Sequence, residues 1–240
     1  MLAYGRPMEN AAGPTVVTAE RMVPGGLALS RDGDGRVVLV AGAIPGERVA
    51  VTTEVRRGAV HGEVVEVLEP SPDRVEPPCP FVALGCGGCD WQHVDEDRQR
   101  AMRLEIVTDA LRRIGRLDDP VVRPGPPIPA ERTRTTLRVA VVDGRLGLRA
   151  EGSHEVVPVD DCLVAHPALA DLLARGVLDP GRARELTLRV ATDAAGAATD
   201  ILVVAEPTAK GVQTPDDVTV IGADELERGT RRWLTTSLAG

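Results

Sequence analysis

The chain has 240 residues, of which 43% are hydrophobic and 27% are charged, and its formal net charge is −8. This composition is typical of globular proteins and excludes a chain that is disordered throughout. The sequence contains no apolar run near the roughly 20 residues that span a membrane, and its N-terminus lacks the apolar core of a signal peptide. We therefore expect a cytoplasmic, monomeric protein with no membrane or DNA partner.

Charge is distributed unevenly along the chain. Residues 98–149 carry 12 basic and 6 acidic side chains, whereas residues 1–97 and 150–240 each carry 8 basic and 15 acidic ones. The central stretch is a basic island in an acidic protein. It is either a solvated helix face, as charge runs commonly are, or a contact surface for an anionic partner.

Residues 15–70 are predicted to form a small β-barrel. Four β-rich runs, at 15–22, 36–41, 47–55 and 60–68, are separated by turns that contain glycine. Short strands at this spacing indicate an all-β barrel, and about 55 residues suit a five-stranded barrel of the oligonucleotide-binding (OB) type. Residues 1–14 are small and polar, and we expect them to be disordered. The proline-rich stretch 70–78 marks the boundary to the next domain.

Residues 71–236 are predicted to form a mixed α+β domain. Apolar positions spaced by three and four residues predict a helix over 95–114, with acidic residues at its start and arginines before Gly115. A second helix begins at Pro167. Strands are expected at 136–142, 146–149, 154–158, 185–191, 201–205 and 218–221, and the short turns between several of them indicate an antiparallel sheet. The predicted fold class is therefore α+β.

The four cysteines of the chain are the most informative residues. Cys79, Cys86 and Cys89 lie close together and Cys162 follows far behind. Four cysteines are too few for a secreted disulfide scaffold of this length, and three crowded thiols with one distant partner are typical of a thiolate-bound metal centre. Four unrelated buried thiols are the plainer alternative.

The spacing favours an iron-sulfur cluster over zinc. Zinc sites usually combine two close pairs of ligands, and this sequence has one such pair, although His93 or His154 could complete a mixed site. Three near cysteines and one remote cysteine suit an iron-sulfur cluster better. A fourth protein thiolate favours a structural or redox role over the radical chemistry that needs an open iron site.

Several segments together resemble the bacterial S-adenosylmethionine-dependent RNA uracil-5-methyltransferases. The expected barrel resembles a TRAM domain, and Cys86-Gly-Gly-Cys-Asp-Trp-Gln-His93 resembles the cluster segment of that family. Arg132-Thr-Arg134 resembles the entry to its central domain, and Val159-Asp-Asp-Cys162 resembles the approach to its fourth ligand. The resemblance implies a 4Fe-4S cluster held by Cys79, Cys86, Cys89 and Cys162, and an RNA partner, either rRNA or tRNA.

The resemblance also implies that the catalytic part of such an enzyme is missing. The family uses a cysteine nucleophile and a doubly wound domain that binds S-adenosylmethionine, and this sequence has neither a fifth cysteine nor a glycine-rich cofactor turn. Residues 237–240 are expected to be a truncated link to that domain. We therefore expect no catalytic residue here, S-adenosylmethionine only in the full-length enzyme, and no methyl transfer by these residues alone.

RNA contact is expected from arginines of the basic island. The candidates are Arg132, Arg134 and Arg138, followed by Arg112 and Arg113, because arginine contacts to phosphate position an RNA. Ion pairs with surface carboxylates are the alternative role for each. Two other functions stay open at this point: a self-contained RNA-binding module with a structural iron-sulfur or zinc site, and a zinc-stapled structural protein without an RNA role.

Overall fold

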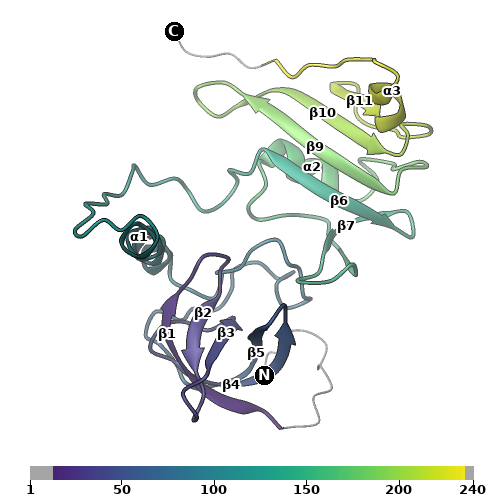
Figure 1. Ribbon diagram of the computed structural model, residues 1–240. Coiled ribbons are helices and arrows are strands. Elements are labelled where there is room, and N and C mark those ends of the chain that lie inside the picture. Colours follow the sequence, from purple (N-terminus) through teal and green to yellow (C-terminus); the bar gives the residue numbers. More distant parts are fainter. Residues whose placement is uncertain (1–12, 236–240) are drawn as a thin grey trace. The chain divides into compact units, whose positions relative to one another are not determined.

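The computed structural model describes residues 13–235 (Figure 1). Most of the expected disordered N-terminus and the whole expected link at 237–240 lie outside these residues. The chain divides into two compact units. Unit 1 runs to Ala83 and resumes over Cys89–Pro127, and unit 2 consists of Leu84–Gly88 and the chain from Ile128 onward. The boundary expected near residue 70 lies inside unit 1.

Unit 1 contains a closed five-stranded barrel, as the sequence predicts. Its strands follow the order β1-β2-β3-β5-β4, with β3 and β5 parallel and the other neighbours antiparallel. The strand β2 has only four residues and follows a Pro-Gly-Gly turn, so the sequence shows no periodic pattern that predicts it. The bounds are β1 Thr15–Met22, β2 Ala28–Arg31, β3 Val37–Ala41, β4 Arg48–Arg56 and β5 Ala59–Glu69.

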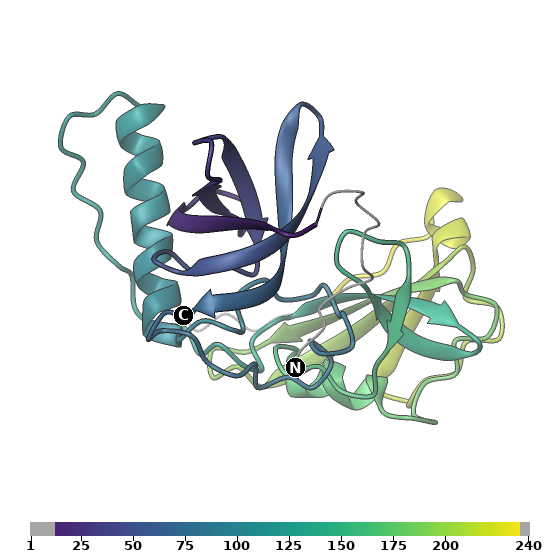
Figure 2. The same cartoon turned by 90° about the horizontal axis from the view of Figure 1, so that it is seen from below.

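A long helix, α1 (Glu96–Arg113), packs beside the barrel in unit 1 (Figures 1 and 2). Met102 is the one fully buried side chain of α1, and it belongs to the same apolar cluster as Val17, Val40 and Ile44 of the barrel. Arg21 on β1 forms an ion pair with Asp109 on α1 at 3.0 Å. The barrel and the helix therefore share one core.

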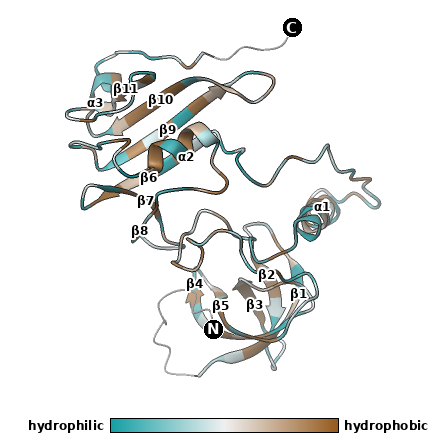
Figure 3. Ribbon diagram, turned by 180° about the vertical axis from the view of Figure 1, so that it is seen from behind, coloured by the Kyte–Doolittle hydropathy of each residue, from teal (hydrophilic) through white to brown (hydrophobic). Residues whose placement is uncertain are grey.

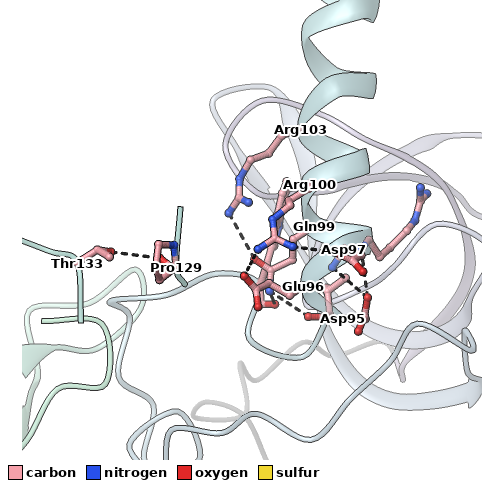
Figure 4. A network of polar contacts seen from close by, with 11 residues as sticks. Asp95, Glu96, Asp97, Gln99, Arg100, Arg103, Pro129 and Thr133 are labelled. Atoms are coloured by element: carbon pink, nitrogen blue, oxygen red, sulfur yellow. Dashed lines mark hydrogen bonds and ion pairs between the residues drawn. The ribbon is translucent and has the colours of Figure 1, made fainter. Parts of the chain in front are cut away.

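The first turn of α1 is held by its own polar side chains (Figure 4). The carboxylate of Asp95 accepts hydrogen bonds from the backbone N–H groups of Asp97 and Arg98, which caps the helix. Arg100 pairs with Glu96 and with Asp97 one turn back. Sequence pattern predicts this helix to within a residue at each end, and the C-cap is Ile114 in place of the expected Gly115.

Unit 2 is built on a six-stranded sheet with the order β11-β10-β9-β6-β7-β8. The sequence predicts an antiparallel sheet, which agrees with every neighbouring pair except β10 and β11 at one edge, which are parallel. A parallel neighbour needs a long crossover, and residues 207–217 supply one. The bounds are β6 Thr136–Val142, β7 Arg145–Arg149, β8 Val156–Pro158, β9 Glu185–Thr192, β10 Ala198–Glu206 and β11 Val218–Gly222.

Two short helices complete unit 2. The helix α2 (Pro167–Leu173) begins at the predicted proline and buries Leu169, Leu172 and Leu173 against β9. Alternate residues of β6 and β9 are buried and form the core there. Figure 3 shows the hydropathy of these strands along the ribbon. The helix α3 (Ala223–Glu227) contacts β10 and β11 and was not predicted. No helix within residues 13–235 is long and apolar enough to cross a membrane.

Candidate metal centre

In unit 1, the residues on either side of the cysteine run are tied to each other. The backbone N–H of Val75 donates to the carbonyl of His93 at 3.0 Å, and the N–H of Asp95 donates to the carbonyl of Asp73 at 2.8 Å. The backbone N–H of Cys79 donates to the side-chain oxygen of Gln92 at 3.2 Å. These bonds close the base of the loop that carries Cys79 and Cys89.

Trp91 anchors the end of this loop to the barrel. Its indole N–H donates to the carbonyl of Gly26 at 3.0 Å, and its ring packs against the barrel core. The guanidinium of Arg103 lies 5.3 Å from the centre of the ring, within the range of a cation–π contact. Gln99 of α1 donates to the carbonyls of Trp91 and Val94, each at 3.0 Å. Cys89 therefore lies two residues before a firmly held position.

In unit 2, the short segment Leu84–Gly88 pairs with the chain just after the end of β7. Cys86 pairs with Ala150 in an antiparallel bridge, and the N–H of Gly87 donates to the carbonyl of Arg149 at 3.0 Å. A Cβ atom at Gly87 would lie 2.6 Å from the backbone nitrogen of Glu151. Glycine is therefore required here for the close approach of the two backbones.

Cys162 is 7% exposed and follows a carboxylate that is engaged by Arg132. The two guanidinium Nη atoms of Arg132 donate to the two carboxylate oxygens of Asp161 at 2.7 and 2.9 Å. The hydrogen bond from Arg132 is the main cause that lowers the pKa of Asp161, and the same bond raises the pKa of Arg132. The carboxylate also accepts from the N–H of Cys162 at 2.7 Å.

The segment Arg132–Thr133–Arg134 contacts both cysteine loops of unit 2. Its backbone pairs with the residues after Cys162, through Arg132 N–H to Leu163 O at 3.0 Å and Arg134 N–H to Val164 O at 2.8 Å. The guanidinium of Arg134 donates to the carbonyl of Gly88 at 3.0 Å, across 46 residues of sequence. Two predicted RNA-contacting arginines are thus engaged next to predicted metal ligands.

The four predicted ligands are divided evenly between the units. Cys79 and Cys89 belong to unit 1, Cys86 and Cys162 belong to unit 2, and none of the four forms a disulfide. Within residues 13–235, no three side chains of Cys, His, Asp or Glu lie close enough together to hold a metal ion. The metal centre is therefore a prediction that the geometry does not test.

The other three predicted RNA-contacting arginines also have acidic neighbours. Arg138 on β6 pairs with Glu185 on β9, and the hydrogen bond between them raises the pKa of Arg138. Arg149 contacts the same carboxylate at 3.2 Å. Arg112 and Arg113 are more than half exposed, and their ion pairs, with Asp119 and Asp109, are long at 3.7 and 3.5 Å. Arg112 and Arg113 are the least engaged of the five.

Sequence reasoning missed a buried polar cluster close to the cysteine run. Glu47 is fully buried and pairs with Arg74, which lies in the stretch that was expected to be only a domain boundary. The Nε2 atom of His93 is buried and has no hydrogen-bond partner among the described residues. Burial, followed by the positive charge of Arg74, lowers the pKa of His93 to about 4. No local sequence pattern indicates that these three residues lie together, because they are 19 to 46 positions apart.

Comparison with known proteins places the chain beside RNA-modifying enzymes. An uncharacterized RNA methyltransferase of Streptomyces coelicolor is 42% identical over 164 residues, which cover 62% of this chain and 36% of the relative. The 23S rRNA (uracil(1939)-C(5))-methyltransferase RlmD of Methylococcus capsulatus is 41% identical over 145 residues, 58% of this chain and 32% of that protein. The chain is similar to RNA methyltransferases. It spans about a third of the length of these curated relatives, and no family model matches it.

A solved structure has a related fold. The tRNA (uracil-54, C5)-methyltransferase of Pyrococcus abyssi, solved with S-adenosyl-L-homocysteine, superposes with a TM-score of 0.52 at 21% identity, covering 84% of this chain and 48% of that chain. At this identity the likeness concerns the fold alone. The closed five-stranded barrel and the second sheet are consistent with the TRAM-like architecture that the sequence predicts.

Proposed function

We propose that these residues form the RNA-binding and 4Fe-4S-binding portion of an S-adenosylmethionine-dependent RNA uracil-C5 methyltransferase, which makes 5-methyluridine in rRNA or tRNA. The observation that carries the proposal is the similarity to RNA methyltransferases over 62% of the chain. The relatives are about three times longer than the matched region, so the methyl transfer itself is assigned to the remainder of such an enzyme. Residues 13–235 supply binding and no catalytic step.

The donor set supports an iron-sulfur cluster. Cys79, Cys86, Cys89 and Cys162 are all thiols, the ligands that iron-sulfur clusters use. The Cys86 and Cys162 segments are held by backbone hydrogen bonds, the backbone of Cys79 donates to the Gln92 side chain, and Gly87 permits a backbone approach at the Cys86 segment that no other residue would permit. When bound, the cluster would supply a structural or a redox centre.

RNA contact is proposed for the arginines, with a division of roles. Arg112 and Arg113 have side chains 54% and 63% exposed, and their ion pairs with Asp119 and Asp109 are long, at 3.7 and 3.5 Å, so exchanging the carboxylate for a phosphate costs them little. Arg138 is 66% exposed and remains able to reach a phosphate beside Glu185. Arg132 and Arg134 hold protein groups, and any RNA contact from them would be shared with that task.

The proposal is tested by purifying the chain without oxygen and measuring iron, acid-labile sulfide and RNA affinity. We expect a brown protein with equal amounts of iron and sulfide, as a 4Fe-4S cluster contains. The colour separates this cluster from a zinc-thiolate site, which is colourless. We expect salt-dependent binding to unmodified rRNA or tRNA transcripts, and no transfer of a tritiated methyl group from S-adenosylmethionine by this chain alone. A colourless zinc protein, or one without RNA affinity, would contradict the proposal.

The RNA contribution is separated from folding by paired variants. Changing Arg112 and Arg113 together to alanine should weaken binding and reduce the slope of log affinity against log salt by about 1.4 for two lost contacts to single-stranded RNA. The matched control is Arg175→Ala with Arg182→Ala, two exposed arginines of unit 2 outside the basic island, which should leave the slope unchanged. An unchanged slope in the Arg112 and Arg113 variant would remove these residues from the interface.

A further inference from the structure

The guanidinium of Arg134 donates a hydrogen bond to the carbonyl of Gly88, and the proposed RNA contact does not account for this bond. Arg134 is exposed, carries no ion pair among the described residues, and directs its guanidinium at a backbone carbonyl 46 residues away. That carbonyl lies two residues after Cys86 and one before Cys89. A charged donor on a neutral carbonyl is stronger than an ordinary backbone bond, and it holds the chain at one point.

The backbone of the same residue fixes the second cysteine of unit 2. The N–H of Arg134 donates to Val164 at 2.8 Å, and the carbonyl of Arg134 accepts from the N–H of His166 at 2.9 Å. Arg134 also pairs with Ala165 in a parallel bridge, while Arg132 holds Asp161. One residue therefore joins the loop after Cys162 through its backbone to the loop after Cys86 through its side chain.

The backbone of the Cys86 segment is attached at the end of β7. Its backbone bonds within unit 2 run to Arg149 and Glu151, at the end of β7, and none of them reaches the Cys162 loop. A Cβ atom at Gly88 would lie 3.8 Å from Arg134 Nη1 and 3.7 Å from Cys86 Sγ. The guanidinium and the thiol thus lie on the same side of Gly88.

We propose that Arg134 is a positioning residue for the metal centre, which presents the Cys86 thiol beside the Cys162 loop by holding the Gly88 carbonyl. The inference rests on the proposed function, since it assigns these two thiols to one centre. It adds to the RNA contact proposed for Arg134 the task of connecting the Cys86 and Cys162 loops. Arginine suits this task because its planar, permanently charged head keeps a fixed direction, whereas lysine offers a flexible point charge.

The test compares the wild-type chain with Arg134→Ala, Arg134→Lys and the control Arg145→Ala, an exposed arginine on β7. In metal-free protein, thiol labelling is followed by mass spectrometry at each cysteine, with Cys79 of unit 1 as the internal standard. In reconstituted protein, the rate of iron loss to a chelator is measured. Far-UV circular dichroism and thermal unfolding confirm that each variant is folded.

We expect Arg134→Ala to change the labelling rate of Cys86 relative to Cys79 by about fivefold and to speed iron loss by a similar factor, the size expected for one lost hydrogen bond. Arg134→Lys should recover part of both effects, and Arg145→Ala should behave as wild type. Unchanged labelling and iron loss in Arg134→Ala would overturn the inference.

A failure of the proposed function is distinguishable from a failure of this inference. If the wild-type chain takes up no iron and sulfide, the proposed centre is wrong. The labelling comparison in metal-free protein still decides whether Arg134 holds the Cys86 segment. If the wild-type chain takes up iron and all four proteins release it at the same rate, the centre stands and Arg134 has no part in it.

Discussion

The carboxylate of Glu47 is fully buried, and Arg74 donates to both of its oxygens, at 2.6 and 2.7 Å. The same carboxylate accepts from the backbone N–H groups of Ile44 and Ser71, and Arg74 also donates to the carbonyl of Gly42. The pair connects the barrel to the chain that leaves it for the cysteine run. Because Arg74 lies five residues before Cys79, its ion pair with Glu47 holds the start of the cysteine run against the barrel.

Removing the Glu47 carboxylate should destabilise unit 1 strongly. Glu47→Ala leaves Arg74 and two backbone N–H groups without their acceptor, and we expect the free energy of unfolding to fall by about 3 kcal/mol, measured by urea denaturation. The control is Glu69→Ala, which removes an exposed ion pair with Arg48 on the same barrel and should cost less than about 1 kcal/mol. Equal losses for the two variants would contradict a special role for Glu47.

Acid should weaken the same region in two steps. Burial lowers the pKa of His93 from 6.5 to about 4. Between these two pH values the unfolded chain binds a proton at His93 and the folded chain does not, so the free energy of unfolding falls as pH falls from 6.5 to 4. Burial alone would raise the pKa of Glu47, but hydrogen bonds from Arg74 and two backbone N–H groups outweigh it and lower that pKa. The contribution of Glu47 is therefore present above pH 4.5 and is lost below it.

His93→Gln separates these steps because it removes only the upper one. We expect the variant to lose less stability than wild type between pH 6.5 and 4, and to keep the steep loss below pH 4.5. The ring protons of His93, followed by nuclear magnetic resonance, should titrate near pH 4. Titration near pH 6.5 would show that the ring is accessible to solvent.

Docking of α1 on the barrel should depend on Met102. Its side chain is fully buried in the barrel core, and Met102→Ala is expected to lower the free energy of unfolding by about 3 kcal/mol, because a cavity remains. Val107→Ala on the same helix, at a position 46% exposed, should change stability by less than about 0.5 kcal/mol. Since alanine favours the helix at both positions, an equal loss in the two variants would show that burial of Met102 in the barrel core does not account for the effect.

Gly87 and Gly88 should respond differently to the same added methyl group. A Cβ atom at Gly87 would meet the backbone of Glu151 at 2.6 Å, whereas one at Gly88 meets its nearest neighbour, Cys86 Sγ, at an ordinary 3.7 Å. We expect Gly87→Ala to speed amide hydrogen exchange in residues 84–88 and 149–151, and Gly88→Ala to leave it as in wild type. Slow exchange in both variants would mean that the backbone near Gly87 shifts to accommodate the methyl group without breaking its hydrogen bonds to residues 149–151.

Local pattern predicts much of this fold. The alternation over residues 15–22 and the three-and-four spacing over residues 95–114 identify β1 and α1 almost to the residue, since burial on one face imposes the period. β2 was missed because four residues after a glycine turn are too few to show a period. The parallel pairing of β10 and β11 depends on the path of the crossover, and no strand pattern contains that information.

The candidate site is less predictable than the fold. The cysteines are conspicuous in the sequence, yet the partners that hold them are single contacts over long separations, such as Arg134 with Gly88 and Arg74 with Glu47. In the sequence, an arginine of the basic island that binds RNA phosphate cannot be distinguished from one that donates a hydrogen bond to a backbone carbonyl. Only the three-dimensional pairing distinguishes these roles.

The five residues Leu84–Gly88 limit how this gene can be divided. They belong to unit 2, while the chain on both sides of them belongs to unit 1, so the polypeptide passes between the units at three places. A fragment that starts at Ile128 lacks Cys86, the bridge partner of Ala150, and one that stops at Pro127 carries Cys86 without that partner. Neither unit can be excised as one continuous piece. A fragment meant to hold all of unit 2 therefore needs residues Leu84–Gly88 as well as the chain from Ile128 onward.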